Sequence, residues 1–365
     1  MRENEDTRGP FVDRACRRRT IVVGRLSLLM ALLALVLVLI PALAGQTAQA
    51  AGSTVSGQTL DSASGLPLEG VNVFLAHTTY GTSSDRDGGF AIRDVAEGSY
   101  TLVCSKVGYA PEMAVVELPR PDSVYVEMRL AVRPIALSEV RVTARSPDEW
   151  TRQLRDFVRA FLGRRDNADG ARILNPEVLD FHVDPATGML VAETDSMLRV
   201  ENRSLGYRVD IVLVSFSWSS KLDAGTIVLY PRFTPLDGRD DRERRKWAEN
   251  RRRTFQGSMT HFLSAAVAGR AGEEGFVVRS GGIPVPESAL GFASVPGTPL
   301  TQWMFDDRLR VEYRGGFLDK VSYIVLREER AVIDSLGFLV TPLCFDVSGE
   351  WARYRVADML PRQPR

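Results

Sequence analysis

Short apolar runs alternate with turn residues along residues 54–133, and this pattern restricts the fold more than any other feature of the chain. Apolar–polar alternation that is broken by Gly, Pro, Asn and Asp every 8–12 residues or so is typical of a small antiparallel β-sandwich. We therefore expect residues 51–133 to form one sandwich domain of about seven strands. The clearest strands are predicted at 55–60, 71–76, 90–92, 100–104, 115–118 and 124–130.

The second predicted strand has two faces of different composition. Side chains point alternately to the two faces of a strand, so Val71, Val73 and Leu75 share one face, and Asn72 and Phe74 share the other.

The stretch Asp85-Arg86-Asp87-Gly88 has two interpretations. Alternating oxygen ligands resemble the opening of a calcium loop, but the Glu that closes such a loop is absent. Asp and Gly also favour tight turns, because they tolerate positive φ and Asp accepts hydrogen bonds from its own backbone. The turn is the favoured interpretation.

Residues 1–50 have the layout of a secretory signal peptide. Arg17, Arg18, Arg19 and Arg25 precede an apolar run over residues 26–40, and small residues follow it, with cleavage expected after Ala44 or Ala50. The run is long for a signal, so a retained membrane anchor is the alternative. Export would place the protein in the periplasm or at the outer membrane.

Composition limits the partner classes. The chain carries 46 Lys/Arg and 46 Asp/Glu, and residues 1–50 contain more basic than acidic residues, which leaves the remainder slightly acidic. This balance gives no reason to expect nucleic acid as a partner. Membrane contact is expected only through an uncleaved signal segment.

The cysteines leave one question open. Cys16 lies in the signal segment, whereas Cys104 and Cys344 lie in predicted strands. An oxidising compartment would permit a Cys104–Cys344 disulfide. Two separate buried thiols are the alternative, since sequence does not show proximity.

A helix is predicted after the sandwich, in a linker region over residues 134–163. Ser146 is placed to cap it, Pro147 occupies the first helical position, and Glu149 completes a capping box. One apolar face follows, made of Trp150, Leu154, Phe157, Val158, Phe161 and Leu162. We expect this face to pack against the sheet that follows in sequence.

Residues 164–365 are predicted to form a β-rich domain of α+β type with no assigned function. A hairpin turn is expected at 184–188, a long strand at 207–218 with a partner at 226–233, a helix at 256–268, a surface loop at 281–300, and a turn at 334–337. Further strands are predicted at 178–183, 189–193, 197–201, 275–279, 309–313, 321–326, 339–345 and 351–356.

The most charged stretch, residues 239–253, holds eight basic and four acidic residues around Trp247. An anionic ligand such as a polysaccharide or lipid phosphate would suit the excess of positive charge. The interspersed acidic residues favour a solvated helix with ion pairs between successive turns.

The candidate catalytic residues form no established motif. His77, His182 and His261 lack a Glu at the spacing that zinc hydrolases use, so no metal, cofactor or catalytic residue is assigned. Ser258 and His261 would share a helix face, and Asp180 or Asp306 could complete a triad. No G-x-S-x-G turn presents Ser258, so a hydrolase is the weaker hypothesis.

The sandwich region resembles the carboxypeptidase regulatory-like domain, a transthyretin-like Greek-key β-sandwich that also occurs in TonB-dependent receptors of the Bacteroidetes type. Such a domain is an accessory module and implies no peptidase activity. The resemblance rests on Val55-x-Gly57, Gly65-x-Pro67-Leu68-x-Gly70-Val71-x-Val73, Gly81-Thr82-x-x-Asp85-x-Asp87-Gly88-x-Phe90, Gly98-x-Tyr100-x-Leu102, Ser105-x-x-Gly108-Tyr109 and Leu137-Ser138-Glu139-Val140-x-Val142.

The later region resembles the C-terminal part of envelope proteins that bear the same first domain, a group that implies no activity. The similar stretches are 173–177, 200–207, Trp247-x-x-Asn250-Arg251, 257–263 and 355–361. Too few residues follow the sandwich for a receptor barrel.

We therefore expect a mostly β, non-catalytic binding or scaffold protein of the cell envelope, whose partner is another envelope protein or a glycan. The alternatives are the hydrolase centred on Ser258 and His261, and an accessory protein of a TonB-dependent transporter.

Overall fold

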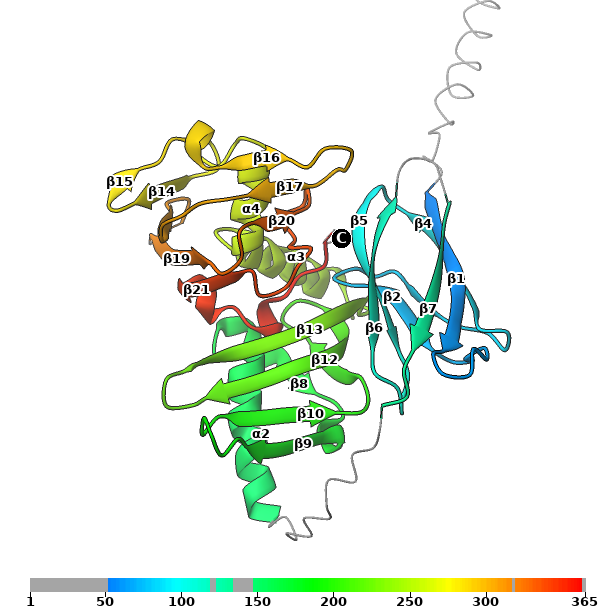
Figure 1. Ribbon diagram of the computed structural model, residues 1–365. Coiled ribbons are helices and arrows are strands. Elements are labelled where there is room, and N and C mark those ends of the chain that lie inside the picture. Colours follow the sequence, from blue (N-terminus) through cyan, green and yellow to red (C-terminus); the bar gives the residue numbers. More distant parts are fainter. Residues whose placement is uncertain (1–51, 119–122, 134–146, 317–318, 363–365) are drawn as a thin grey trace, which may run out of the picture. The chain divides into compact units, whose positions relative to one another are not determined.

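The computed structural model describes residues 52–118, 123–133, 147–316 and 319–362 (Figure 1). Strands dominate these ranges, as predicted. The expected signal segment, the cap at Ser146 and the similarity at 137–142 lie outside the described residues. No helix within the described ranges is both long and apolar enough to cross a bilayer.

Seven strands form the sandwich in two sheets. One sheet has the order β4-β1-β7 and the other the order β3-β2-β5-β6. The pair β1–β7 is parallel, which corrects the expectation of a purely antiparallel sandwich. The strands are β1 (Ser53–Asp61), β2 (Asn72–Leu75), β3 (Gly81–Ser83), β4 (Gly89–Val95), β5 (Gly98–Ser105), β6 (Glu112–Leu118) and β7 (Ser123–Leu130).

Both faces of β2 are apolar and buried. Val71, Val73 and Leu75, which share one face as the alternation indicates, lie in the sandwich core. Phe74, on the opposite face, is also fully buried, in a second cluster that includes Val212 of the following sheet. The sandwich therefore packs on the later region through the face that carries Phe74.

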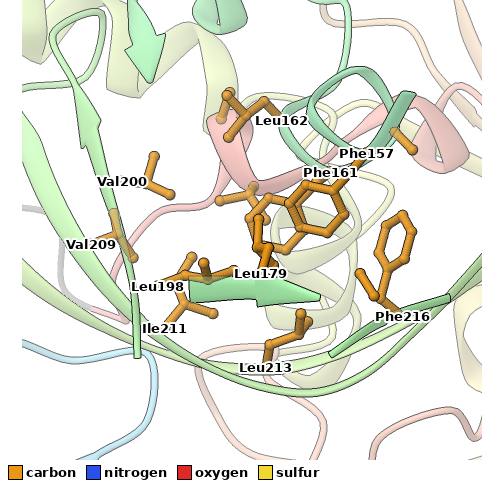
Figure 2. Close-up of a cluster of buried hydrophobic side chains, with 14 of the residues drawn as sticks. Phe157, Phe161, Leu162, Leu179, Leu198, Val200, Val209, Ile211, Leu213 and Phe216 are labelled. Carbon is orange, nitrogen blue, oxygen red and sulfur yellow. The ribbon is translucent and has the colours of Figure 1, made fainter. Parts of the chain in front are cut away.

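The expected helix is present as α2 (Pro147–Leu162), and its apolar face covers a six-stranded sheet. Figure 2 shows Phe157 and Phe161 facing side chains of the sheet, among them Leu179 and Phe216. The rings of Phe157 and Phe216 are 4.7 Å apart, a favourable distance for aromatic packing. This core confirms the predicted role of the helix.

The six-stranded sheet has the order β8-β11-β12-β10-β9, with β13 paired to β12. The predicted turn at 184–188 joins β9 and β10, where the Asp184 carboxylate accepts hydrogen bonds from the N–H groups of Ala186 and Thr187. The strands are β8 (Ala171–Ile173), β9 (Leu179–Val183), β10 (Leu190–Thr194), β11 (Leu198–Asn202), β12 (Tyr207–Ser219) and β13 (Ala224–Pro235).

Two helices follow, α3 (Asp241–Phe255) and α4 (Met259–Val267). The helix α3 is fixed to the turn between β11 and β12 by three side chains. Trp247 donates to the carbonyl of Arg203, Asn250 to that of Ser204, and Arg251 to that of Leu205, at 2.7–2.8 Å. These contacts give the stretch 247–251 a structural role.

The remaining strands form a five-stranded sheet, β15-β14-β18-β19-β21, and a three-stranded sheet, β16-β17-β20, around a separate hydrophobic core. The strands β14 and β18 are antiparallel neighbours, and Val278 is paired with Val311. The strands are β14 (Phe276–Ser280), β15 (Ile283–Pro284), β16 (Phe292–Ser294), β17 (Thr301–Trp303), β18 (Leu309–Tyr313), β19 (Lys320–Leu326), β20 (Ala331–Ile333) and β21 (Phe345–Gly349).

Three predictions in this region are wrong. The expected loop at 281–300 contains β15, β16 and a 3-10 turn at Glu287–Ala289. The stretch 339–344 is not a strand, because Pro342 lacks a backbone donor and Leu343 has φ of 63°. The stretch 351–356 forms a 3-10 turn at Trp351–Arg353 and begins another at Val356–Asp358.

Two short 3-10 turns lie between α2 and β9. They lie at Asp166–Gly170 and Pro176–Val178, on either side of β8. The split into a sandwich at 51–133, a linker at 134–163 and one domain at 164–365 stays a prediction, although residues 164–365 contribute to two distinct hydrophobic cores.

Candidate functional site

The candidate site is a cavity of about 660 Å³ that side chains from distant parts of the chain enclose. Its walls come from β13, from the junction of α3 and α4, from the segment 336–343, and from the C-terminal segment 351–362. His77 and Thr101 of the sandwich also contribute. Small-molecule sites typically enclose about 300–1,000 Å³, so this cavity has the size of a binding site.

The walls are predominantly apolar. Aliphatic and aromatic side chains form most of the surface, including Trp218, Ile227, Leu229, Met259, Phe338, Leu339, Val347, Trp351, Met359 and Leu360. Such a surface favours an apolar ligand, because burial releases water from both partners. A sugar would need many more hydrogen-bonding groups than this surface offers.

Several of the polar wall groups are already bonded within the protein. Ser258 accepts a hydrogen bond from the His261 N–H at 3.1 Å and so caps α4. The hydroxyl of Thr254 and the carboxylate of Asp358 both accept from the amide of Asn167, each at 2.8 Å. These groups stabilise the wall and are engaged before any ligand arrives.

Tyr354 and Arg355 are two further polar residues of the wall. The Tyr354 hydroxyl is buried without a hydrogen-bond partner in the described ranges, and burial raises its pKa to about 12. The Arg355 guanidinium lies 4.8 Å from the Trp218 ring, donates to the carbonyls of Ala352 and Tyr354, and forms no ion pair with a described carboxylate. Burial lowers the Arg355 pKa. The apolar wall therefore contains one cation whose charge no described carboxylate pairs with.

The opposite part of the wall contains a polar cluster around Arg362. This side chain pairs with the Asp334 carboxylate and donates to the Ser99 carbonyl at 2.6 Å. Its guanidinium lies 4.4 Å from the Tyr100 ring, while its Nε has no described partner. Nearby, burial lowers the His77 pKa to about 3, and the charge of Arg362 acts in the same direction. His77 is therefore neutral at ordinary pH.

The structure does not assemble Ser258 and His261 as a nucleophile and its base. The His261 Nδ1 accepts the Gly257 N–H at 3.0 Å, and its Nε2 lies 2.8 Å from the Glu274 carboxylate. Both ring nitrogens are therefore engaged by groups other than the Ser258 hydroxyl. Asp180 lies in β9 and Asp306 precedes β18, whereas the carboxylate that contacts His261 is that of Glu274. This geometry gives no support to the hydrolase hypothesis.

The stretch 85–88 is a turn, as favoured from the sequence. The Asp85 carboxylate accepts the N–H groups of Asp87 and Gly89 at 3.0 and 2.8 Å, and Gly88 has φ of 74°. No group of three His, Cys, Asp or Glu side chains suited to a metal occurs among the residues that the structure describes.

Cys104 and Cys344 are separate buried thiols, so no disulfide joins them. Burial raises the Cys104 pKa to about 12 and the Cys344 pKa to about 11. Each thiol packs in a different hydrophobic core. The alternative of two independent apolar cysteines is the correct one.

The charged helix α3 is a solvated, ion-paired helix on most of its surface. Glu249 accepts from Arg252 and Arg253 at 2.7–2.9 Å, and these contacts lower its pKa to about 2. Arg239 pairs with Glu243 across one turn. The ion pairs fit the solvated interpretation of this stretch.

Sequence reasoning missed the C-terminal segment as a cavity wall. The resemblance at 355–361 was its only signal, and in the structure Arg355, Val356 and Asp358 line the cavity. The neighbouring Ala357 carbonyl accepts from Asn202 at 2.8 Å, which fixes the segment to β11. Lining residues that lie nearly 300 positions apart in the chain leave no local pattern.

Comparison with known proteins identifies the first domain. The family model of the CarboxypepD_reg-like domain matches residues 55–142. No curated protein matches the chain.

The similar solved structures include a chain of a type II cohesin–X-dockerin complex from Acetivibrio cellulolyticus, with 26% identity and a TM-score of 0.19. That match covers 21% of this chain and 53% of the other, so this chain spans about half of the other's length. A DUF3823 family protein from Bacteroides uniformis shows 11% identity and a TM-score of 0.18, with coverage of 78% and 99%.

At these TM-scores the solved structures support no conclusion about function. The family match, in contrast, agrees with the seven strands and the two sheets of the N-terminal region. The N-terminal sandwich of this protein is a carboxypeptidase regulatory-like domain.

Proposed function

We propose that this protein is a non-catalytic binding protein of the cell envelope, and that the cavity is its ligand site. The ligand class is an amphiphile with one apolar chain and a small acidic head, such as a fatty acid. The observation that carries the proposal is an apolar cavity of about 660 Å³ with the Arg355 guanidinium in its wall, where no described carboxylate pairs with it.

The charge arrangement supports an acidic head. A carboxylate beside Arg355 would gain a charge-assisted hydrogen bond in partly desolvated surroundings. The apolar chain would lie against side chains such as Leu339 and Met359. A neutral glycan has too many hydroxyl groups to suit a wall that is mostly apolar.

The envelope location rests on the predicted signal segment and on the accessory domain, which occurs in exported proteins. An accessory role beside a TonB-dependent transporter is the second candidate. The sandwich of this protein matches the CarboxypepD_reg-like domain, and the resemblance noted above extends to TonB-dependent receptors. An isolated complex of the protein with such a transporter would favour that second candidate.

A competition assay tests the proposal. The purified protein is titrated with 1-anilinonaphthalene-8-sulfonate, and saturated fatty acids of increasing length are added as competitors. The Leu339→Trp variant places an indole in the cavity wall, while Leu222→Trp introduces the same change at a side chain that is 72% exposed and lies outside the wall.

We expect fatty acids to displace the probe, and Leu339→Trp to weaken their binding about tenfold or more, since occupied volume excludes the ligand. Leu222→Trp should bind like the parent protein, and thermal unfolding should show that both variants fold. Equal binding by the two variants, or no displacement by any chain length, would contradict the proposed site.

A further inference from the structure

The outer face of the five-stranded sheet carries a row of polar side chains that the cavity does not use. Arg279 of β14 is in register with Arg310 of β18, Arg310 with Tyr323 of β19, and Tyr323 with Ser348 of β21. Residues opposite one another on neighbouring strands point to the same face. Because strands are about 4.8 Å apart, the four side chains form one row that crosses the sheet and follows its twist.

Three guanidinium groups on this face converge on a single buried carboxylate. Glu312 has a side chain only 6% exposed, and it accepts from Arg279 at 2.9 Å, from Arg314 at 2.8 Å and also from Arg310. Arg279 additionally donates to the Gly282 carbonyl at 3.2 Å. The carboxylate holds the three cations in fixed positions but neutralises only one of them.

A fourth cation lies beside this cluster. The Arg308 guanidinium is 4.8 Å from the Tyr323 ring, which keeps it over the same row. Asp319 acts on Arg314 by its charge, and Asp307, next to Arg308 in sequence, accepts a hydrogen bond from Ser280 at 3.4 Å. With Glu312, four arginines therefore face three carboxylates in this neighbourhood. Arg327 and Asp346 form their own pair farther along the face. The row therefore has an excess of ordered positive charge.

We propose that this face, defined by Arg279, Arg308, Arg310, Arg314, Tyr323 and Ser348, binds an acidic polysaccharide, a linear glycan that carries carboxylate or sulfate groups. Guanidinium groups pair with such oxyanions in a forked geometry, and the Tyr323 and Ser348 hydroxyls offer hydrogen bonds to the sugar hydroxyls. The continuous row suits an extended chain with repeated charges.

Two other anionic partners fit this face less well. Duplex DNA requires many cations along its backbone, whereas the whole chain has a formal net charge of zero. A bilayer requires several apolar side chains that project beyond the cations, whereas Val325, 39% exposed, is the exposed large apolar side chain on this face of the described strands. The site is separate from the cavity, so the proposal does not depend on the proposed function.

Binding of the full chain to immobilised dextran sulfate, polygalacturonate and neutral dextran tests the proposal. The test variant is Arg308→Gln/Arg310→Gln, which leaves Glu312 paired with Arg279 and Arg314. The matched control is Arg242→Gln/Arg245→Gln, which removes the same charge from the exposed surface of α3. Duplex DNA and phosphatidylglycerol vesicles are further arms, and thermal unfolding verifies that each variant folds.

We expect both acidic glycans to bind, with an affinity that falls as salt rises, and neutral dextran not to bind. The test variant should bind them about tenfold more weakly or worse, whereas the control should stay close to the parent protein. Equal losses in the two variants would show a nonspecific charge effect and overturn the proposal. Tighter binding to DNA or to vesicles, or absence of glycan binding, would also overturn it.

Discussion

The backbone N–H of Arg362 donates a hydrogen bond of 2.7 Å to the carbonyl oxygen of His77. The Arg362 side chain reaches Ser99 in the same sandwich and Asp334 after β20. One residue near the C-terminus thus connects the first domain with the segment that follows the three-stranded sheet. Both His77 and Arg362 line the cavity, so this connection also closes part of its wall.

Replacement of Arg362 by Met should destabilise the protein. The Asp334 side chain is only 5% exposed, and loss of its partner would leave a buried charge. Breaking a buried ion pair in this way costs about 3–5 kcal/mol. Urea denaturation of Arg362→Met measures the change in the free energy of unfolding.

The double variant Arg362→Met/Asp334→Asn is the control for that measurement. An Asn side chain carries no charge, and its carbonyl can still accept the N–H groups of Leu336 and Phe338, which now bond to the Asp334 carboxylate at 2.8 and 3.0 Å. The double variant should regain part of the lost stability. If it is no more stable than the single variant, the unpaired charge is not the cause.

The stability of the protein should decrease in acid because of His77. Its pKa is about 3 in the folded protein and 6.5 when exposed, so the unfolded chain binds the extra proton between these values. The free energy of unfolding should therefore fall as pH drops from 6.5 towards 3, by an amount on the order of a few kcal/mol.

His77→Asn isolates this contribution. His77 has φ of 60°, a left-handed conformation that Asn tolerates, while the titrating ring is removed. Denaturation curves between pH 7 and 3.5 should show a shallower loss of stability in the variant than in the parent protein. Parallel curves would assign the acid sensitivity to other groups.

Gly206 and Gly188 form a matched pair for a test of close packing. Both have positive φ, of 72° and 69°, but a Cβ at 206 would meet the Trp247 ring at 2.3 Å, and a Cβ at 188 would meet nothing within 4 Å. Gly188→Ala should cost about 1–2 kcal/mol for its backbone conformation alone. Gly206→Ala should cost about 1–3 kcal/mol more. Thermal unfolding compares the two, and equal costs would refute the packing argument.

Cys104 and Cys344 should resist alkylation in the folded protein. Both thiols are buried and have raised pKa values, whereas the thiolate is the reactive form. Iodoacetamide labelling followed by peptide mass spectrometry should find these two positions unmodified in buffer and modified in guanidinium chloride. A reducing agent should leave the unfolding curve unchanged; a shift would indicate a disulfide.

Much of the local structure could be predicted from the sequence. The turns at 85–88 and 184–188 depend on Asp and Gly chemistry within four or five residues, and the apolar face of α2 depends on a period of 3.6 residues. The solvated surface of α3 follows from charges spaced three and four residues apart. These signals are carried by near neighbours in the chain, so they remain readable without coordinates.

The tertiary structure decided what depends on distant partners. Phe74 lies on the face of its strand opposite the sandwich core, and it is buried in a cluster that includes Val212 of the following sheet. Residues 351–356 have strand-like apolar character, yet Trp351 bonds to Ser322 and Gly257, and the backbone turns there.

The cavity depends on the residues that are most distant from one another in the sequence. Its wall joins His77 to Arg362 and β13 to the C-terminal segment, and neither its volume nor the free Tyr354 hydroxyl has a trace in local sequence. Alternation and turn chemistry determined the strands, the sandwich and its family, because those features arise between near neighbours. Folding alone determined the cavity, since a cavity is the space left between elements that the chain brings together from far apart.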